Sequence, residues 1–527
     1  MTATQLPKSR HSPGELGGHA ARGFAWLGVQ SAVEKVASGI GQVALAWLLE
    51  PGAFKLVGLT YTITVFASIM QSAGLREVLQ QRQRRLDVWC TPGFWLSLTL
   101  GLAAALLIVL TTPWAAAFYS DARIQPLLLV SAIMLPLNSL GIVPEVMLRS
   151  RMRFRTIALA GSLVLVGQMI LSIAFALLGF GAMSIILPQP ILALARLIIY
   201  WQAARPRIRH GPRPHRWRFL VGDSSAMLLG SVAFMFTYQG GQIVLGRMHP
   251  DSADAGIYYF CVVLADQSVR VLVNNLGGVL LPALSRLQDD PARLSRAFLN
   301  ATGLVLLIGM PMCALQATLA APLIRLFFSD KWLPAIGCFA AMSASAIGRL
   351  AFGPSESMLL AQGRFRAYMS LACCYGVVFL GAVTLTASLA PVAGAASWTA
   401  AAGGVCLMIM GPCSLRLAIA SGGTGWPGIL RLYRWPLVCT VVSISPALGL
   451  VLFMPRTHIG DASTLIIGSA ACAVLYISLI RRLAPADWNQ LVIRITATAP
   501  GRVRPLIGRL LPLGRAAAQA QPSPTTS

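Results

Sequence analysis

The chain has 527 residues, of which 56% are hydrophobic and only 11% are charged, and its formal net charge is +25. Soluble domains average about 25% charged residues, so this composition excludes an ordinary soluble protein. The basic charge would suggest nucleic acid, but it forms no basic face that carries base-reading or stacking side chains.

Apolar runs long enough to cross a lipid bilayer recur along the whole chain. A spanning helix needs about 20 residues, and about fourteen such runs can be counted. They cover residues 24–48, 56–75, 93–111, 125–144, 156–178, 181–203, 219–246, 256–281, 298–318, 333–353, 367–389, 392–414, 435–454 and 462–480. Backbone groups in lipid must bond within their own segment, so each run is expected to be a helix. The predicted fold class is an all-α polytopic membrane protein.

The basic residues alternate between the two sides of these runs. Of the 42 lysines and arginines, 32 lie in the two tails and in alternate connections, six lie in the other connections, and four lie within runs. This is the pattern of the positive-inside rule, so we expect both termini to be cytoplasmic and the number of spans to be even. The basic charge is thereby assigned to topology and to the lipid bilayer, and no nucleic-acid partner is expected.

One short segment occurs twice. The pattern E-x-M-L-x4-R-F-R occupies residues 145–155 and returns at residues 356–366, an offset of 211. A second pattern, F-x-S-D, starts at Phe118 and again at Phe327, an offset of 209. Two matches in the same order indicate a duplicated unit of about 210 residues. Six predicted spans separate the copies, so both enter the membrane in the same direction, as in transporters built from parallel repeats.

The repeat predicts how the chain is organised. Two six-helix lobes are expected, followed by two C-terminal helices and a tail that is partly disordered in composition. The predicted parts are an N-terminal lobe at 1–209, a cytoplasmic linker at 210–217, a C-terminal lobe at 218–418, two further spans in 419–484 and a cytoplasmic tail at 485–527.

Ionisable side chains within the spans mark candidate functional positions, because each costs roughly 2.5–3.5 kcal/mol on insertion scales. The bases are Lys35, Arg196, Arg270 and Arg349, with Arg76 at a span end, and the acids are Glu34, Asp223 and Asp266. Glu34 and Lys35 are adjacent and point about 100° apart on a helix, so at least one is expected to face a polar interior.

Structural interpretations stay open for several of these residues. Asp266 and Arg270 are four residues apart, so they share a helix face and could form a local neutral pair. Arg196 and Arg349 lie near the predicted cytoplasmic ends of their spans, so both side chains could extend to the membrane interface.

Signals for catalysis are missing from the sequence. There is neither a G-x-x-x-x-G-K-[ST] loop for nucleotide phosphates nor an H-E-x-x-H metal motif. The predicted exoplasmic connections are short, which leaves little room for an active site on that side. We therefore expect no enzyme, no catalytic residues and no metal site.

Five segments between residues 22 and 480 carry a resemblance to a known family. They are G-L-x3-L-x-Q-R at 74–82, L-x4-R-F-R at 148–155, G-x-Y-Y at 256–259, LPALSRLQDD at 281–290 and DKWLPA at 330–335. With the predicted spans, they resemble the oligosaccharide flippases of the MOP (multidrug/oligosaccharidyl-lipid/polysaccharide) exporter superfamily. The similarity is greatest to Wzx-type flippases of the colanic acid exporter group.

This resemblance implies a function. Such flippases move an undecaprenyl-pyrophosphate-linked oligosaccharide from the cytoplasmic to the periplasmic leaflet of the bacterial inner membrane by alternating access, for lipopolysaccharide or exopolysaccharide synthesis. Polysaccharide polymerase and export machinery are the implied partners. No cofactor is expected, and a proton or sodium ion as coupling ion is left open.

The resemblance also gives the embedded charges their expected roles. A pyrophosphate needs several cationic donors, and arginine suits it best. The predicted cationic cavity consists of Arg270, Arg349, Lys35, Arg196 and Arg76. The candidate ion-coupling acids are Glu34, Asp266 and Asp223.

Two other functions compete with this prediction. A multidrug or cation antiporter of the same superfamily would favour acidic cavity residues, whereas the spans contain four bases and three acids. A membrane polysaccharide polymerase would need a sizeable exoplasmic loop with paired catalytic groups, and the predicted spans leave none.

Overall fold

The computed structural model describes most of the chain. The described residues are 35–72, 75–81, 86–151, 153–208, 211, 217, 225–267, 290–391, 394–419, 425–485, 488–489 and 492. The chain divides into two compact units, residues 1–232 and 233–527. This division falls within α10 (Ser225–Met248), beyond the predicted linker at 210–217.

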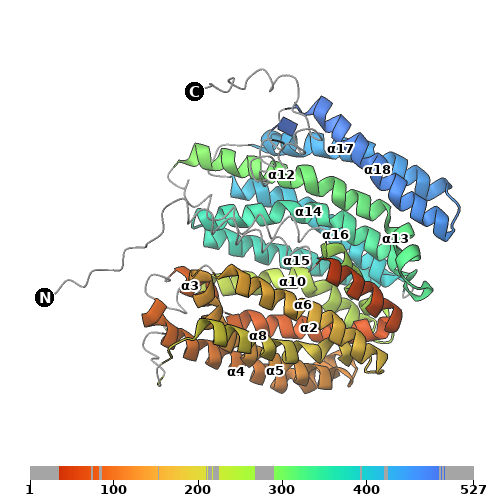
Figure 1. Ribbon diagram of the computed structural model, residues 1–527. Helices are drawn as coiled ribbons and strands as arrows, with labels where there is room; N and C mark the ends of the chain where they lie inside the picture. Colours follow the sequence, from red (N-terminus) through yellow and green to blue (C-terminus); the bar gives the residue numbers. More distant parts are fainter. Residues whose placement is uncertain are drawn as a thin grey trace, which may run out of the picture. The chain divides into compact units, whose positions relative to one another are not determined.

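Both units are built from helices, and the described residues contain no strand (Figure 1). The first unit contains α2 (Pro51–Ser72), α3 (Leu75–Gln81), α4 (Leu86–Tyr119), α5 (Ile124–Ser150), α6 (Phe154–Leu177), α7 (Met183–Ile186) and α8 (Pro188–Ala204). The second contains most of α10, then α12 (Pro291–Thr318), α13 (Ala320–Phe327), α14 (Ala335–Ala361), α15 (Phe365–Leu389), α16 (Ala395–Ala418), α17 (Trp426–Phe453) and α18 (His458–Leu483). A short 3-10 helix, η3, covers Asp330–Trp332.

Eleven of the described helical segments are long and apolar enough to cross a membrane. The predicted all-α polytopic class is confirmed. The three predicted runs without a counterpart among the eleven are 24–48, 219–246 and 256–281, and each includes residues outside the described part. The count of fourteen spans therefore stays a prediction.

Polar side chains in these helices are satisfied locally. In α2, the hydroxyl groups of Thr60, Thr62, Thr64 and Ser68 each donate to the backbone carbonyl four residues earlier, at 2.8–2.9 Å. This back-bonding lets a helix that contains several hydroxyl groups lie in an apolar environment. The hydroxyl groups of this helix are therefore structural.

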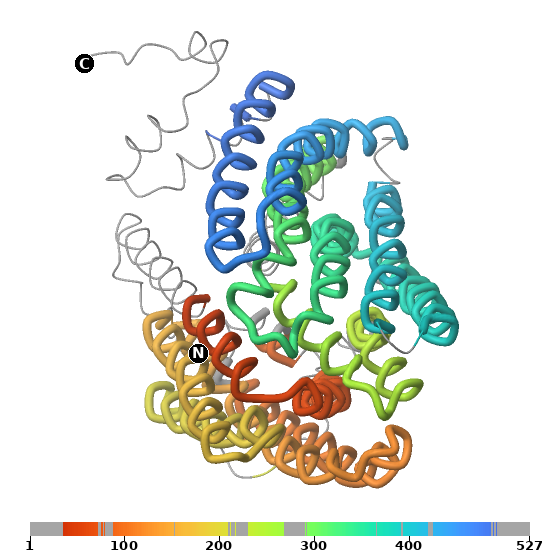
Figure 2. The backbone as a smooth tube through the Cα atoms, turned by 90° about the vertical axis from the view of Figure 1, so that its right-hand side faces the viewer, coloured from red at the N-terminus to blue at the C-terminus, as the bar shows by residue number. Residues whose placement is uncertain are grey.

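One helix occupies the centre of each unit. In the first unit α5 packs against α2, α4 and α8, and in the second α14 packs against α12 and α16. The last two helices, α17 and α18, pack against each other and lie side by side (Figure 2).

The two central helices are the copies that the sequence repeat predicts. Adding 211 to both bounds of α5 gives both bounds of α14, and α6 and α15 begin at the same relative position. The preceding cap residues, Arg153 and Arg364, have nearly identical backbone angles: φ −82° and ψ 52°, and φ −85° and ψ 55°. The duplication is thus visible in helix bounds and in the turn between the helices.

The repeated arginines have a structural role in this turn. Nη1 of Arg153 donates to the carbonyl oxygen of Ala203 at 2.7 Å, and Nη1 of Arg364 donates to that of Leu417 at 3.0 Å. Both acceptors lie in the last turn of a helix, α8 or α16, where backbone carbonyls have no partner within the helix. In each unit the motif therefore places a cation at a helix C-terminus, which also suits the helix dipole.

Glycines bring α14 and α16 into backbone contact. A Cβ added at Gly411 would lie 2.6 Å from the carbonyl oxygen of Gly348, and one added at Gly404 would lie 2.9 Å from the Cβ of Ser345. Small residues permit this close approach between membrane helices. The contact holds the backbone of α14 next to Arg349, one of the predicted cavity residues.

Candidate functional site

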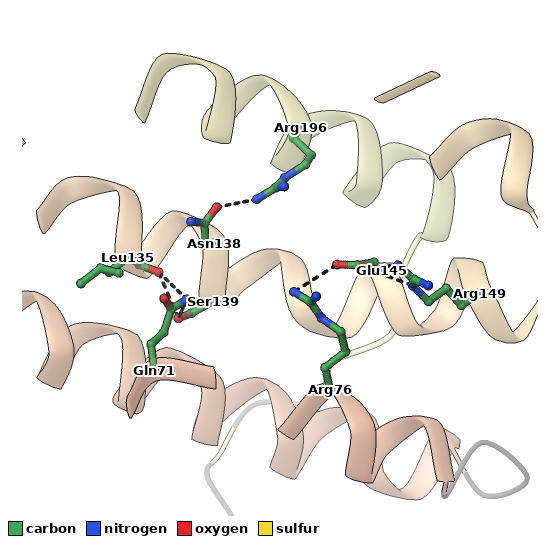
Figure 3. Close-up of polar contacts among 8 residues, drawn as sticks. All are labelled: Gln71, Arg76, Leu135, Asn138, Ser139, Glu145, Arg149 and Arg196. Atoms are coloured by element: carbon green, nitrogen blue, oxygen red, sulfur yellow. Dashed lines mark hydrogen bonds and ion pairs between the residues drawn. The ribbon is translucent and has the colours of Figure 1, made fainter. Parts of the chain in front are cut away.

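The first unit gathers charged side chains near the end of α5 that is predicted to be cytoplasmic. Arg149 donates from Nε and Nη2 to Oε1 of Glu145, at 3.0 and 2.9 Å. Nη2 of Arg76, on α3, lies 3.5 Å from Oε2 of the same carboxylate (Figure 3). The carboxylate side chain is 12% exposed, whereas the arginine side chains are 45% exposed at Arg76 and 41% at Arg149.

A second arginine contact lies farther along α5. Nη2 of Arg196, on α8, donates to Oδ1 of Asn138 at 2.6 Å (Figure 3). The side chain of Arg196 thus contacts a neighbouring helix, and its partner is neutral. Tyr200, one turn later on α8, lies within electrostatic range of Glu145 and of Arg76, Arg149 and Arg196.

An amide network adjoins these contacts. Nε2 of Gln71, on α2, donates to the carbonyl oxygen of Leu135 at 3.0 Å and to Oγ of Ser139 at 2.9 Å (Figure 3). These bonds tie α2 to α5, whereas Asn138 on the same helix points toward Arg196 of α8 (Figure 3). Polar contacts from α2, α3 and α8 therefore all meet α5.

The charges of this polar cluster do not balance. Among the side chains that the structure describes, it contains three arginines and one carboxylate, Glu145. Guanidinium groups present planar, paired donors that match the oxygens of a carboxylate or phosphate. The arrangement can therefore accept a further anion, and we call Arg76, Arg149, Arg196 and Glu145 the arginine cluster.

The second unit contains a buried ion pair. Nη2 of Arg349, on α14, donates to Oδ1 of Asp266, and the two side chains are only 17% and 9% exposed. The guanidinium carbon of Arg349 also lies 5.6 Å from the ring centre of Tyr238, on α10, within the range of a cation–π contact. The Nε atom of Arg349 is buried and has no hydrogen-bond partner among the described residues.

This pair joins two residues to which the sequence assigned different roles. Asp266 was expected among the coupling acids and Arg349 in the cationic cavity, with extension to the interface as its alternative. The structure instead joins the two side chains across a separation of 83 residues. The proposed local partner of Asp266, Arg270, lies outside the described residues.

The remaining predicted site residues are Lys35, Glu34, Asp223 and Arg270. Lys35 is the first residue of the first described helix and is half-buried. Glu34 and Asp223 lie outside the described residues, as Arg270 does. Within the part that is described, no group of three His, Cys, Asp or Glu side chains could hold a metal ion.

Sequence reasoning missed part of the arginine cluster. Arg149 was counted only among the basic residues that set topology, and Asn138 was not among the predicted site residues. The spacing of Glu145 and Arg149, four residues apart with the acid first, is a signal for a helical ion pair. Nothing in the sequence indicated that Arg76 would reach the same carboxylate, because that contact joins two separate helices.

An apolar groove lies apart from these charges. It has a volume of about 450 Å³ between α2 and α4 and is lined by Phe66, Met70, Trp114 and Phe118 among others. None of the predicted site residues lines it. Its lining matches hydrocarbon and offers nothing to a charged group.

Comparison with known proteins identifies the family of this chain. The family described as "Polysaccharide biosynthesis protein" matches residues 44–337, which is more than half of the chain. The chain belongs to this polysaccharide biosynthesis protein family. The predicted resemblance to polysaccharide flippases is confirmed at the level of the family.

Two curated relatives agree with this assignment. The chain is 27% identical over 301 residues to the succinoglycan biosynthesis transport protein ExoT of Rhizobium meliloti, covering 56% of this chain and 60% of ExoT. It is 24% identical over 443 residues to the teichuronic acid biosynthesis protein TuaB of Bacillus subtilis, covering 81% of this chain and 88% of TuaB. The match thus spans less than two thirds of ExoT but most of TuaB.

The fold of this family member also matches a solved flippase structure. The lipid II flippase MurJ in an inward closed conformation aligns with a TM-score of 0.68 and 12% identity, over 86% of this chain and 99% of MurJ. At this identity the match shows the fold alone. The fold class expected from the sequence is confirmed by it.

Proposed function

We propose that this protein moves an undecaprenyl-diphosphate-linked oligosaccharide from the cytoplasmic to the periplasmic leaflet of the bacterial inner membrane, by alternating access. The product would supply lipopolysaccharide or exopolysaccharide synthesis, together with a polymerase and export machinery. Family membership and the flippase-like fold support translocation in general. The arginine cluster supports a cargo with an anionic group.

The excess of bases in the arginine cluster carries this proposal. A diphosphate presents several oxygens with negative charge, and charge-assisted bonds from arginine are about twice as strong as neutral ones. Arg76 and Arg149 are both partly exposed, so an anion can reach them without unfolding the helix ends. Both lie at the end of the first unit predicted to be cytoplasmic, where a cargo made in the cytoplasm would arrive.

The positive net charge of the arginine cluster favours transport of an anionic cargo over the transport of cationic drugs by an antiporter. A site for cationic drugs needs uncompensated acids, whereas Glu145 in the first unit faces two arginines and Asp266 in the second is paired with Arg349. A cationic drug would meet net positive charge at the arginine cluster. Among its described side chains the same cluster offers one carboxylate, Glu145, whereas a polymerase would need a second one for acid–base work.

A coupling ion belongs to the proposal as well. We propose that a proton or sodium gradient drives the cycle, with Asp266 as the candidate acid among the described residues. The measurement is polymer export in cells treated with ionophores that collapse one gradient at a time. Export that continues after both gradients are lost would exclude coupling and indicate movement driven by consumption of the product.

The test of the cargo site uses two arginine variants and a matched control. Arg76→Ala with Arg149→Ala should lower polymer export per folded molecule by at least about tenfold, the effect of losing about 1.4 kcal/mol of binding. The control is Arg293→Ala, because Arg293 is an exposed arginine paired with Asp290 and should leave export unchanged. Wild-type export by the double variant, at normal protein level, would exclude the arginine cluster as the cargo site.

A further inference from the structure

Glu145 occupies the place between two guanidinium groups that a phosphate would take. Its two oxygens are divided between the arginines, because Oε1 accepts from Arg149 and Oε2 faces Arg76. A phosphate group would offer oxygens to the same two side chains. The carboxylate therefore resembles, in charge and in contacts, the anion that the site is proposed to bind.

The two contacts of Glu145 are unequal. Arg149 makes two hydrogen bonds within one helix turn, at 3.0 and 2.9 Å, whereas Arg76 approaches from another helix to only 3.5 Å. The exposed part of each guanidinium group remains open to a second anion, since the arginine side chains are 41–45% exposed. The contact with Arg76 is the one that an incoming anion can exchange at low cost.

The described part of the second unit has a different arrangement at the equivalent glutamate. Glu356 holds the same position in the second unit and is hydrogen-bonded to the Tyr368 side chain. Among the described residues it makes no ion pair, and the position equivalent to Arg149 is Leu360. In the described part of the second unit, the same glutamate of the same motif thus has a tyrosine partner, whereas Glu145 has two arginine partners.

An internal carboxylate has two effects on an arginine site. It lowers the cost of holding two cations near each other in a partly apolar environment. It also weakens the binding of any external anion, because that anion must displace the carboxylate first. A transporter benefits from this weaker binding, because a cargo that is bound equally tightly in every state of the transport cycle would not be released.

We propose that Glu145 is an internal counterion that the diphosphate of the lipid-linked cargo displaces on binding and that returns to Arg76 on release. This inference rests on the proposed function. It makes Glu145 a positioning residue whose removal strengthens cargo binding and slows cargo release. A purely structural glutamate would have the opposite effect on binding, because its loss would disorder the arginines.

The experiment compares Glu145→Gln with Glu356→Gln in the full-length protein, purified and held in lipid nanodiscs. The probes are farnesyl diphosphate and inorganic pyrophosphate, with farnesol as the control that lacks phosphate. Glu145→Gln should lower the dissociation constant for both phosphate probes about tenfold, as expected for removal of one competing charge-assisted contact. Polymer export in cells should fall at the same time, and Glu356→Gln should leave the dissociation constants unchanged.

The outcomes separate this inference from the proposed function. Unchanged or weaker probe binding by Glu145→Gln, while Arg76→Ala with Arg149→Ala abolishes binding, would overturn the counterion role and leave the cargo site standing. Normal export and binding by the arginine variant would overturn both. Tighter binding with reduced export supports the inference, because misfolding cannot strengthen binding.

Discussion

The two units share a framework and differ in their charges. Their central helices, α5 and α14, have bounds related by one offset, and in both units an arginine of the same motif bonds to a carbonyl at a helix end. Yet in the first unit two arginines contact the carboxylate of Glu145 and a third contacts Asn138, while the second unit pairs Arg349 with Asp266. The comparison teaches that residues shared by the two copies stabilise the fold. The residues that differ between the copies determine the charge of each candidate site.

Breaking the buried pair of the second unit should have the largest effect. Asp266→Asn would leave Arg349 buried without a counterion, which costs about 3–5 kcal/mol of folding free energy. The measurement is the yield and unfolding temperature of the purified protein. A double variant, Asp266→Asn with Arg349→Met, should recover much of that loss.

The surface pair Asp290–Arg293 provides the control, because its side chains are 46% and 73% exposed. Exposed pairs contribute about 0–1 kcal/mol, so Asp290→Asn should change the unfolding temperature little. If Asp266→Asn proved as stable as the wild type, the buried pair would contribute nothing to the second unit.

Removing the repeated arginines should have an intermediate and unequal effect. Arg364→Ala deletes a bond to the last turn of α16, and hydrogen bonds to charged groups contribute about 1.5–3 kcal/mol. Arg153→Ala should cost less, because the second bond to the end of α8, from Nη1 of Arg151 to Ala204, is charged and 2.8 Å long, whereas its counterpart at α16, from Nε2 of Gln362 to Ala418, is neutral and 3.4 Å long. Chemical unfolding of both variants measures the difference, and equal losses would contradict the shared capping of α8.

The smallest effect is expected at the loop that carries the second repeated pattern. Hydrogen bonds from Arg123 lower the pKa of Asp121, so the folded carboxyl is more acidic than the unfolded one. This contribution is present above the unfolded pKa, near 3.8, and is lost as the pH falls through the lower folded value. It is small at neutral pH, because the side chain of Arg123 is 74% exposed.

Arg123→Gln tests this pH dependence. The variant should unfold at a slightly lower temperature than the wild type at pH 7, and the difference should shrink as the pH falls below 4. A difference that stayed constant down to pH 2 would show that the ion pair is not its source. The equivalent aspartate of the second unit, Asp330, instead begins the 3-10 helix that buries Trp332.

Much of the architecture could be predicted from local sequence patterns. Runs of apolar residues predicted the helices, and the repeated motif predicted two related parts. The boundaries were less accurate, because helices extend past the apolar run: the run at 93–111 lies within a helix that covers Leu86–Tyr119. The run at 181–203 proved to be two helices, α7 and α8, that meet at Leu187.

The candidate site was predictable only in part. Embedded charge pointed to Arg76, Arg196, Arg349 and Asp266, and all four make polar contacts with another helix. Their partners could not be read from spacing, because they come from other helices, 58 residues away for Arg196 and 83 for Arg349. The helical ion pair of Glu145 and Arg149 was within reach of sequence reasoning but was interpreted as topology alone.

By itself, the sequence determined the helical membrane fold and the duplication. Both depend on local properties of the chain, because the backbone hydrogen bonds of a helix lie within that helix and each copy contains its own motif. Only the tertiary structure decided which charges meet. Arg76 reaches Glu145 and Asp266 reaches Arg349 because packing brings separate helices together. The net charge of each candidate site depends on these contacts.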